Sequence, residues 1–205
     1  MRLAMFAAVL FALAAPVARA LPTATQVAVA FKALDATGNG EISMEEWERG
    51  SFALFRAADK NKNDFIDADE LQGSSIAQDT FLRADTDHDG KLSIAEFMAL
   101  RRAIFTIADI DRDDALSFVE FELLVVMEQV GWVDRNQNGR IELSELRESL
   151  TKAFEQLDGD HDGFLSTAEA VYMPPAEFKK FDRNLDGKLA LDEFIAGYRV
   201  ALLAD

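Results

Sequence analysis

The chain contains no cysteine, and this absence excludes disulfide bonds, thiolate metal sites and cysteine nucleophiles together. Histidine is almost as scarce, since only His88 and His161 occur, far apart in the sequence. Two such distant histidines make a poor transition-metal site, and we expect both side chains to be solvated. Thiol chemistry and soft metals therefore play no part in what this sequence predicts.

Basic residues are also few: the chain has 21 lysines and arginines against 37 aspartates and glutamates. Nucleic acids and anionic membranes both require a basic face, so we expect neither as a direct partner. A strongly acidic chain can be disordered, but 49% hydrophobic residues and regularly placed phenylalanines favour a packed core.

No apolar run after the N-terminus is long and charge-free enough for a membrane helix. At the N-terminus, Arg2 supplies a positive start, Leu3–Ala15 an apolar stretch of 13 residues, and Ala18–Ala20 a cleavage signal. Such a stretch is too short to cross a bilayer, which takes about 20 residues, so we predict a signal peptide over residues 1–20 and no membrane span. The protein is then exported, to the periplasm or the extracellular space; the segment has a bacterial style, and a eukaryotic secretory route stays open. Cleavage after Ala20 removes two arginines and leaves a net charge of −18.

What the chain does contain is an acidic frame of twelve residues, seen best at Asp85–Glu96. Calcium takes six to eight oxygen ligands at about 2.3–2.6 Å, and a short loop supplies them by wrapping around the ion. Gly90, at position 6 of the frame, permits the positive φ that the sharp turn needs. The oxygens would come from carboxylates at positions 1, 3, 5 and 12, a backbone carbonyl at position 7 and a hydroxyl or water at position 9: Asp85, Asp87, Asp89, Glu96, Lys91 and Ser93.

The same residues have a purely structural explanation. Runs of Asp, Asn and Gly are ordinary in surface turns, and Ser93 with Glu96 forms a capping box that starts a helix without any metal. Repetition decides between the two readings. Seven frames of this design begin at residues 35, 59, 85, 109, 134, 158 and 182, with steps of 24, 26, 24, 25, 24 and 24 residues. Such a fixed period indicates a repeat architecture, in which every frame has the same role.

We number the frames loops 1 to 7, spanning residues 35–46, 59–70, 85–96, 109–120, 134–145, 158–169 and 182–193. Loop 1 departs most from the design, because Thr37 replaces the usual acid or amide at position 3. Loops 2 and 4 have Asp64 and Asp114 at position 6, where glycine is usual; aspartate tolerates left-handed geometry, so both loops should close. The predicted metal ligands, at positions 1, 3, 5, 7 and 12 of each loop, are Asp35, Thr37, Asn39, Glu41, Glu46, Asp59, Asn61, Asn63, Phe65, Glu70, Asp85, Asp87, Asp89, Lys91, Glu96, Asp109, Asp111, Asp113, Ala115, Glu120, Asp134, Asn136, Asn138, Arg140, Glu145, Asp158, Asp160, Asp162, Phe164, Glu169, Asp182, Asn184, Asp186, Lys188 and Glu193.

The segments between the loops carry apolar residues at helical spacing. Only twelve residues separate Glu96 from Asp109, and the gap before loop 6 is the same. One helix of about 15 residues, roughly 22 Å long, is therefore expected to leave one loop and enter the next. Residues 121–133 are apolar nearly all round, which predicts a buried central helix.

Two connections contain helix breakers, Gly73–Ser75 and Pro174–Pro175. We therefore divide the mature chain into residues 21–72 with loops 1 and 2, residues 73–173 with loops 3 to 6, and residues 174–205 with loop 7 and a C-terminal helix. Which loops pair with one another stays open at this point.

The repeat resembles the EF-hand superfamily over residues 27–203, and within it exported bacterial multi-EF-hand proteins of the calsymin-like kind. The resemblance implies an all-α fold, a tandem array of seven EF-hand helix–loop–helix units with short or shared connecting helices. It also implies calcium binding through loop positions 1, 3, 5, 7, 9 and 12. We expect five to seven Ca²⁺ per chain, and the resemblance names no protein partner.

The function expected is that of a non-enzymatic calcium buffer or calcium-stabilised structural module. The alternative is a calcium-dependent adaptor or sensor that exposes an apolar groove to a protein partner. An enzyme finds little support, because no Ser/His/Asp set or carboxylate dyad exists outside the loops. We expect a monomer, with a dimer through the C-terminal helix as the alternative.

Overall fold

The computed structural model describes residues 21–71 and 78–203, so the expected leader and the Gly73–Ser75 break lie outside the described residues. The described chain is mostly helical, as expected, with very short strands inside the loops. Its helices are α2 (Ala24–Leu34), α3 (Met44–Ala58), α4 (Ala68–Leu71), α5 (Gln78–Ala84), α6 (Ile94–Ala108), α7 (Phe118–Val130), α8 (Leu143–Leu157), α9 (Pro175–Phe181) and α10 (Leu191–Leu202). Its strands are β1 (Glu41–Ser43), β2 (Phe65–Ile66), β3 (Leu92–Ser93), β4 (Ala115–Ser117), β5 (Phe164–Leu165) and β6 (Leu189–Ala190).

The strands pair the loops in an order that does not follow the sequence. β2 pairs antiparallel with β3 and β5 with β6, which joins loop 2 to loop 3 and loop 6 to loop 7. β1 pairs with β4, so loop 1 meets loop 4, with Ile42 opposite Leu116. Loop 5 has no strand partner within the described residues.

Helix length explains this order. α3 is one unbroken helix of 15 residues between loops 1 and 2, and α6 is another between loops 3 and 4. Each holds its two loops about 22 Å apart, so loops joined by such a helix cannot pair with each other. Because α3 and α6 pack side by side in opposite directions, loop 2 meets loop 3 at one end and loop 1 meets loop 4 at the other. The shared helices expected between loops 3 and 4 and between loops 5 and 6 are confirmed.

The α3–α6 contact is held by a buried polar group as well as by apolar side chains. Trp47 Nε1 donates to the carbonyl of Arg101 at 2.8 Å, and Arg101 Nε donates to Ser51 Oγ at 3.1 Å. The Arg101 guanidinium also lies 3.9 Å from the centroid of the Trp47 ring, a cation–π geometry. These contacts fix the register of the two helices and thereby the pairing at both of their ends.

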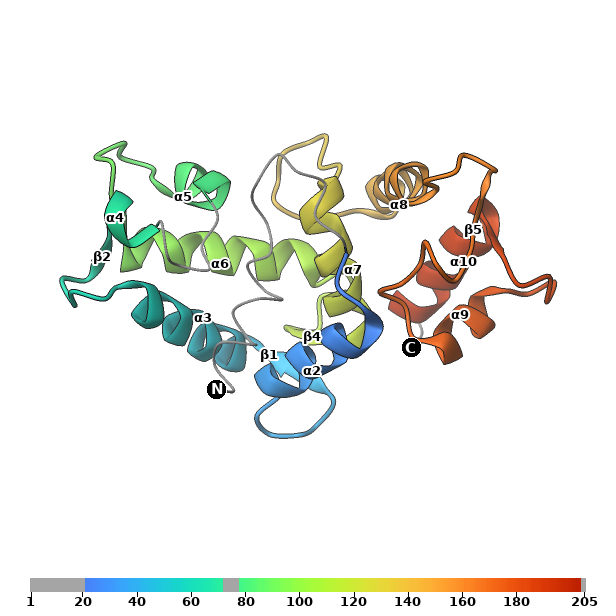
Figure 1. Ribbon diagram of the computed structural model, residues 1–205, viewed down its shortest axis with the longest axis horizontal. Helices are drawn as coiled ribbons and strands as arrows, with labels where there is room; N and C mark the ends of the chain where they lie inside the picture. The colour runs from blue at the N-terminus through green and yellow to red at the C-terminus, as the bar shows by residue number, and fades with distance from the viewer. Residues whose placement is uncertain (1–20, 72–77, 204–205) are drawn as a thin grey trace.

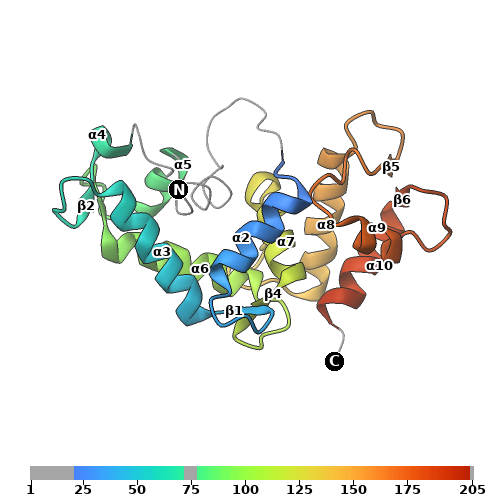
Figure 2. The ribbon, with the colours of Figure 1, turned by 60° about the horizontal axis from the view of Figure 1, so that its bottom comes forward.

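α7 is the central helix of the molecule (Figures 1 and 2) and contacts α2, α6, α8 and α10. Its residues from Glu120 to Met127 are all buried, which confirms the expected buried central helix. The helix ends at Val130 rather than at residue 133, because Gly131 adopts a φ of 84° there. Along the long axis the loop pairs succeed one another, with loops 2 and 3 at one end, loops 1 and 4 in the middle and loops 6 and 7 at the other end (Figure 1).

The C-terminal part of the chain turns back on itself. After loop 6 the chain forms turns up to Pro174, and the short helix α9 begins at Pro175, where proline's fixed φ suits a first helical turn. Loops 6 and 7 can therefore pair. The apolar stripe of α10 is covered by the chain's own helices, since Phe194, Tyr198 and Leu202 are buried.

Candidate metal centres

Each loop is built into the helices on its two sides. At the start of loop 3, the backbone N–H of Asp85 donates a hydrogen bond of 2.9 Å to the carbonyl of Phe81, which caps the end of the preceding helix. Ser93 and Glu96 form the capping box at the other end, because Glu96 N donates to Ser93 Oγ and Ser93 N donates to Glu96 Oε2. Ser93 and Glu96 therefore do form a capping box. Glu96 has a second role as well, because its other carboxylate oxygen turns into the loop and accepts a hydrogen bond from Thr86 N at 2.9 Å.

This arrangement of the closing glutamate recurs in all seven loops. One oxygen accepts a backbone N–H at position 2 or 3, and the other accepts the backbone N–H at position 9. The donors near the start of each loop are Thr37, Lys60, Thr86, Ile110, Arg135, Gly159 and Arg183. The donors at position 9 are Ser43, Asp67, Ser93, Ser117, Glu142, Ser166 and Ala190. The backbone therefore aims every position-12 carboxylate at the loop centre.

The backbone turns at two positions in every loop. Position 6 has positive φ throughout, and Asp64 and Asp114 adopt it at 67° and 66°, as expected for loops that still close. Position 4 has positive φ as well, which the sequence did not reveal, because the residues there share no chemical type. They are Gly38, Lys62, His88, Arg112, Gln137, His161 and Leu185. Both histidines point into solvent, as expected.

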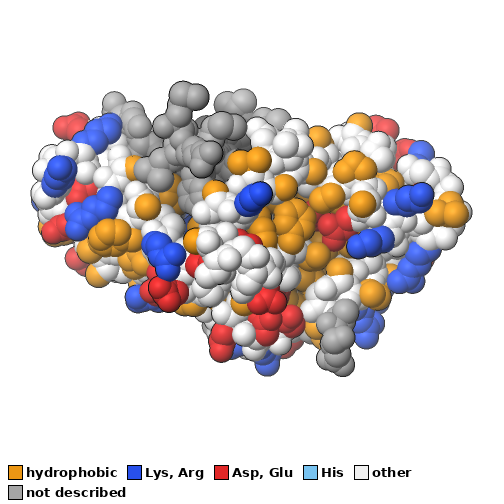
Figure 3. Space-filling model, turned by 90° about the horizontal axis from the view of Figure 1, so that it is seen from below, with side chains coloured by type: hydrophobic (Ala, Val, Ile, Leu, Met, Phe, Trp, Pro, Cys, Tyr) orange, Lys and Arg blue, Asp and Glu red, His pale blue; other side chains and the backbone are white. Residues whose placement is uncertain are grey.

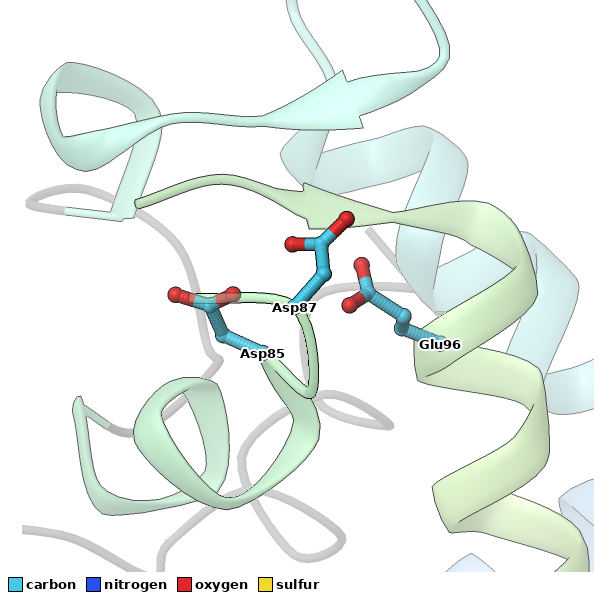
Figure 4. Close-up of side chains that lie close together, drawn as sticks. All are labelled: Asp85, Asp87 and Glu96. Atoms are coloured by element: carbon cyan, nitrogen blue, oxygen red, sulfur yellow. The ribbon is translucent and has the colours of Figure 1, made fainter. Parts of the chain in front are cut away.

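Three of the loops gather three carboxylates each, with one oxygen from every group within 4.8 Å of the others. Figure 4 shows one of these sets, in which Asp85 and Asp87 from the loop and Glu96 from the start of α6 lie around a common centre. The three sets belong to loops 3, 4 and 6: Asp85, Asp87 and Glu96; Asp109, Asp111 and Glu120; Asp158, Asp160 and Glu169.

A cation fits these centres on two grounds. Asp85 Oδ1 and Asp109 Oδ1 are buried and have no hydrogen-bond partner among the described residues, a costly state that an ion would relieve. The donors are all oxygens, which suits Ca²⁺ and does not suit softer metals.

The electrostatics differ between loops. In loop 4, burial raises the pKa of Asp109 and of Asp111, and their carboxylate neighbours add to the rise. Burial raises the pKa of Glu120 as well, so the ionised form of all three groups is disfavoured. In loop 3, burial alone would raise the pKa of Glu96. Hydrogen bonds from Ser93 and Thr86 outweigh this effect and lower the pKa of Glu96 to about 2. A cation bound in loop 4 would therefore favour the ionised form of all three groups.

The other loops have fewer carboxylates at positions 1, 3, 5 and 12. In loop 1, Thr37 occupies position 3, where an acid is usual, and its hydroxyl lies 3.4 Å from Asp35 Oδ1. In loop 5 the amides of Asn136 and Asn138 donate to Glu142 at 3.0 and 2.8 Å, which places a carboxylate at position 9 over the loop. In loop 7, Asn184 takes the place of the acid at position 3.

Among the described residues, Arg56 and Lys188 form ion pairs with predicted ligands, and sequence reasoning missed both. Arg56 lies 3.2 Å from Asp59 Oδ2 and 2.5 Å from Asp64 Oδ1 in loop 2. Lys188 of loop 7 lies 2.5 Å from Asp162 Oδ2 in loop 6. The ion pair of Arg56 with Asp59 could have been predicted, because residues at i and i+3 at the end of a helix lie close together. The second depends on the pairing of loops 6 and 7, which the sequence left open.

Loops 4 and 5 meet at a hollow although no strand joins them. Both loops line it, together with Leu203 beyond the end of α10; the apolar lining consists of Ile110, Ile141, Leu143 and Leu203.

Within the described residues, no helix is long and apolar enough to cross a membrane.

Comparison with known proteins agrees with this geometry. The EF hand family model matches residues 27–52, 53–73, 77–100, 133–151 and 150–169, which contain loops 1, 2, 3, 5 and 6. A calcium-dependent protein kinase 20 from Oryza sativa subsp. japonica is 31% identical over 165 residues, which are 76% of this chain and 25% of the kinase. This chain therefore spans a quarter of the length of that relative. A crystal structure of a C-terminal domain is similar over 78% of this chain and 80% of its own, with 18% identity and a TM-score of 0.22, too low to support an argument. On its family matches and its loop geometry, the chain belongs to the EF-hand family.

Proposed function

We propose that the loops are calcium sites, that five to seven Ca²⁺ bind per chain, and that the protein serves as an exported calcium buffer or calcium-stabilised structural module. One observation carries the proposal: in every loop the backbone already holds the position-12 carboxylate toward the loop centre. Loops 4 and 7, which the family model does not match, share this hydrogen bonding and the two positive φ angles.

The apolar residues support a fixed core rather than an adaptable groove. Calcium sensors that open expose a methionine-rich surface. Here Met127 and Met173 are buried, and Met44 and Met98 are partly buried against the core. The large exposed apolar side chains lie on several different elements, and on the face in Figure 3 apolar areas alternate with acidic and basic side chains. We therefore expect calcium to compact the protein and to hide apolar surface.

The calcium-dependent adaptor is the second candidate. The rice relative is a calcium-dependent kinase by name, and the hollow between loops 4 and 5 has a partly apolar lining that ions in either loop would reshape. No catalytic activity is proposed for this chain.

A hydrophobic dye titrated with calcium distinguishes the two candidates. For a buffer or structural module the dye fluorescence falls as calcium saturates the protein, because apolar surface is buried. The emission of Trp47, which is fully buried in α3, serves as the control that the fold is intact, and it is read in a Trp132→Phe variant because Trp132 is a second tryptophan. A dye signal that rises while Trp47 stays buried would favour the adaptor, and a calcium-dependent pull-down should then follow.

Export and a monomeric state complete the proposal. Residues 1–20 have the composition of a leader, and N-terminal sequencing of the protein recovered outside the cytoplasm should begin at Leu21. The burial of the α10 stripe on the chain's own helices supports a monomer, since it leaves that face without need of a second copy. Sedimentation with and without calcium tests this, and a calcium-promoted dimer would contradict it.

A further inference from the structure

A buried polar cluster lies outside the calcium loops, at the junction between α7 and the C-terminal helices. Glu122 of α7 is fully buried, and its Oε1 accepts a hydrogen bond of 3.0 Å from the Tyr198 hydroxyl of α10. The Tyr172 hydroxyl lies 3.4 Å from that of Tyr198, and both tyrosines are fully buried. Glu177 of α9 lies beside Glu122 and is buried as well.

This cluster is expensive in an otherwise apolar helix. A buried carboxyl group costs free energy unless it is hydrogen-bonded, and Glu122 Oε2 has no donor among the described residues. Burial, with the charge of Glu177 adding to it, raises the pKa of Glu122 far above its ordinary value. A leucine at position 122 could be buried at a lower cost in free energy than this carboxyl group. We therefore looked for a function of the carboxyl group.

The position of the cluster indicates such a function. Glu122 stands two residues after Glu120, the closing ligand of loop 4, on the same rigid helix. The other residues of the cluster all come from the C-terminal lobe, the part of the chain that holds loops 6 and 7: Tyr172 from the turns after loop 6, Glu177 from the helix entering loop 7, and Tyr198 from the helix leaving loop 7. The hydrogen bond from Tyr198 to Glu122 thus crosses the contact between α7, the closing helix of loop 4, and α10, the helix that leaves loop 7.

We propose that Glu122 is a positioning residue that couples calcium binding in loop 4 to calcium binding in the paired loops 6 and 7. Glu120 lies in the first turn of α7, so any adjustment of that turn to an ion also moves Glu122 and, through its hydrogen bond, Tyr198 of α10. By thermodynamic linkage the effect is reciprocal, so an ion in loops 6 and 7 favours binding in loop 4 by the same factor. The inference rests on the proposed function, since it requires calcium in loops 4, 6 and 7.

The cluster carries its own reporters, because Tyr172 and Tyr198 are the only tyrosines of the chain. Fluorotyrosine incorporated into the mature protein gives ¹⁹F resonances from these two residues alone. In the variant Tyr198→Phe the hydrogen bond to Glu122 is lost, and Tyr172 remains as a single reporter of the lobe that contains loops 6 and 7. Glu122→Gln is the matched control, since its side-chain carbonyl still accepts from Tyr198.

The experiment compares the calcium midpoint of the Tyr172 resonance with and without Glu120→Gln, which disables loop 4. In the wild-type background we expect Glu120→Gln to raise the midpoint about fivefold or more, a typical coupling factor. In the Tyr198→Phe background the increase should fall below about twofold, and with Glu122→Gln it should be retained.

An equal increase in the wild-type and Tyr198→Phe backgrounds would overturn the proposal, and so would the absence of any increase in the wild type. Loss of the increase in Glu122→Gln would show that packing, and not this hydrogen bond, transmits the effect. Native mass spectrometry of the same samples counts the bound ions. A chain that binds no calcium would refute the proposed function itself, whereas an unchanged ion count with equal midpoint increases refutes the coupling alone.

Discussion

At the scale of single residues, the loops show which backbone features a sequence reveals. Position 6 was predictable, because Gly or Asp stands there in all seven loops and both tolerate left-handed φ. Position 4 was not, because side chains as different as His88 and Leu185 occupy the same region of φ. The geometry at position 4 is imposed by the hydrogen bonds of the whole loop, and a residue there carries no local signal of it.

Leu185 is the residue least suited to this conformation, and it is 72% exposed. We predict that Leu185→Asn stabilises the protein by roughly 0.5–1 kcal/mol, because asparagine tolerates left-handed φ and leucine does not. Leu185→Ala is the matched control: it removes the exposed apolar side chain and keeps the strain. Chemical denaturation with saturating calcium measures both, and equal stabilities of the two variants would contradict the explanation.

Ligand charge ranks the calcium sites. Loops 3, 4 and 6 should bind most tightly, since each has carboxylates at positions 1, 3, 5 and 12, and the structure gathers three carboxylates in these same loops. We predict that Glu96→Gln or Glu169→Gln lowers the number of high-affinity calcium ions by about one, whereas Glu46→Gln in loop 1 changes little. A calcium titration by competition with a chelating indicator measures the three variants. Equal losses from all three would refute the ranking.

At the scale of elements, the lengths of the connecting helices were predictable and the pairing of the loops was not. Twelve residues between closing glutamate and next aspartate leave room for one helix only, and α6 and α8 are that helix. The partners of loops 1 to 4 depend on how α3 packs against α6, which rests on contacts such as Trp47 with Arg101 across 54 residues. No local pattern records such a contact. The division into segments at residues 72 and 173 stays a prediction.

The pairing of loop 1 with loop 4 makes a test at this scale. Ile42 of β1 and Leu116 of β4 face each other and are both fully buried. We predict that Ile42→Ala lowers the free energy of unfolding by roughly 2–4 kcal/mol, because it leaves a cavity at the joint. It should also speed amide exchange in residues 115–117, while residues 92–93 at the other end of α6 stay protected.

The control for this prediction is Val29→Ala, at a half-exposed position of α2, which should change stability by less than about 0.5 kcal/mol. Hydrogen exchange read by mass spectrometry resolves the segments. Faster exchange confined to loop 1 would show that its strand does not pair with β4.

At the scale of the whole molecule, the main determinant of compactness is the balance between the negative charge of the chain and the positive charge of bound calcium. Removal of the proposed leader, residues 1–20, would leave a net charge of −18, and seven calcium ions would bring it to −4. Without ions, the carboxylates of each loop repel one another, and this repulsion opposes the compact state. An ion that binds only the folded form stabilises it by mass action. Calcium is therefore expected to determine how compact this array is, and not only to occupy it.

The most direct test of this account is the number of calcium ions that one chain binds. Native mass spectrometry of the mature protein, with excess calcium and then with excess chelator, counts them without any assumption about the sites. We predict five to seven Ca²⁺ per chain, removed by the chelator, with no binding of softer metals in competition. Two or fewer ions would contradict the account, because most of the seven loops would then be turns that keep the EF-hand shape without its metal.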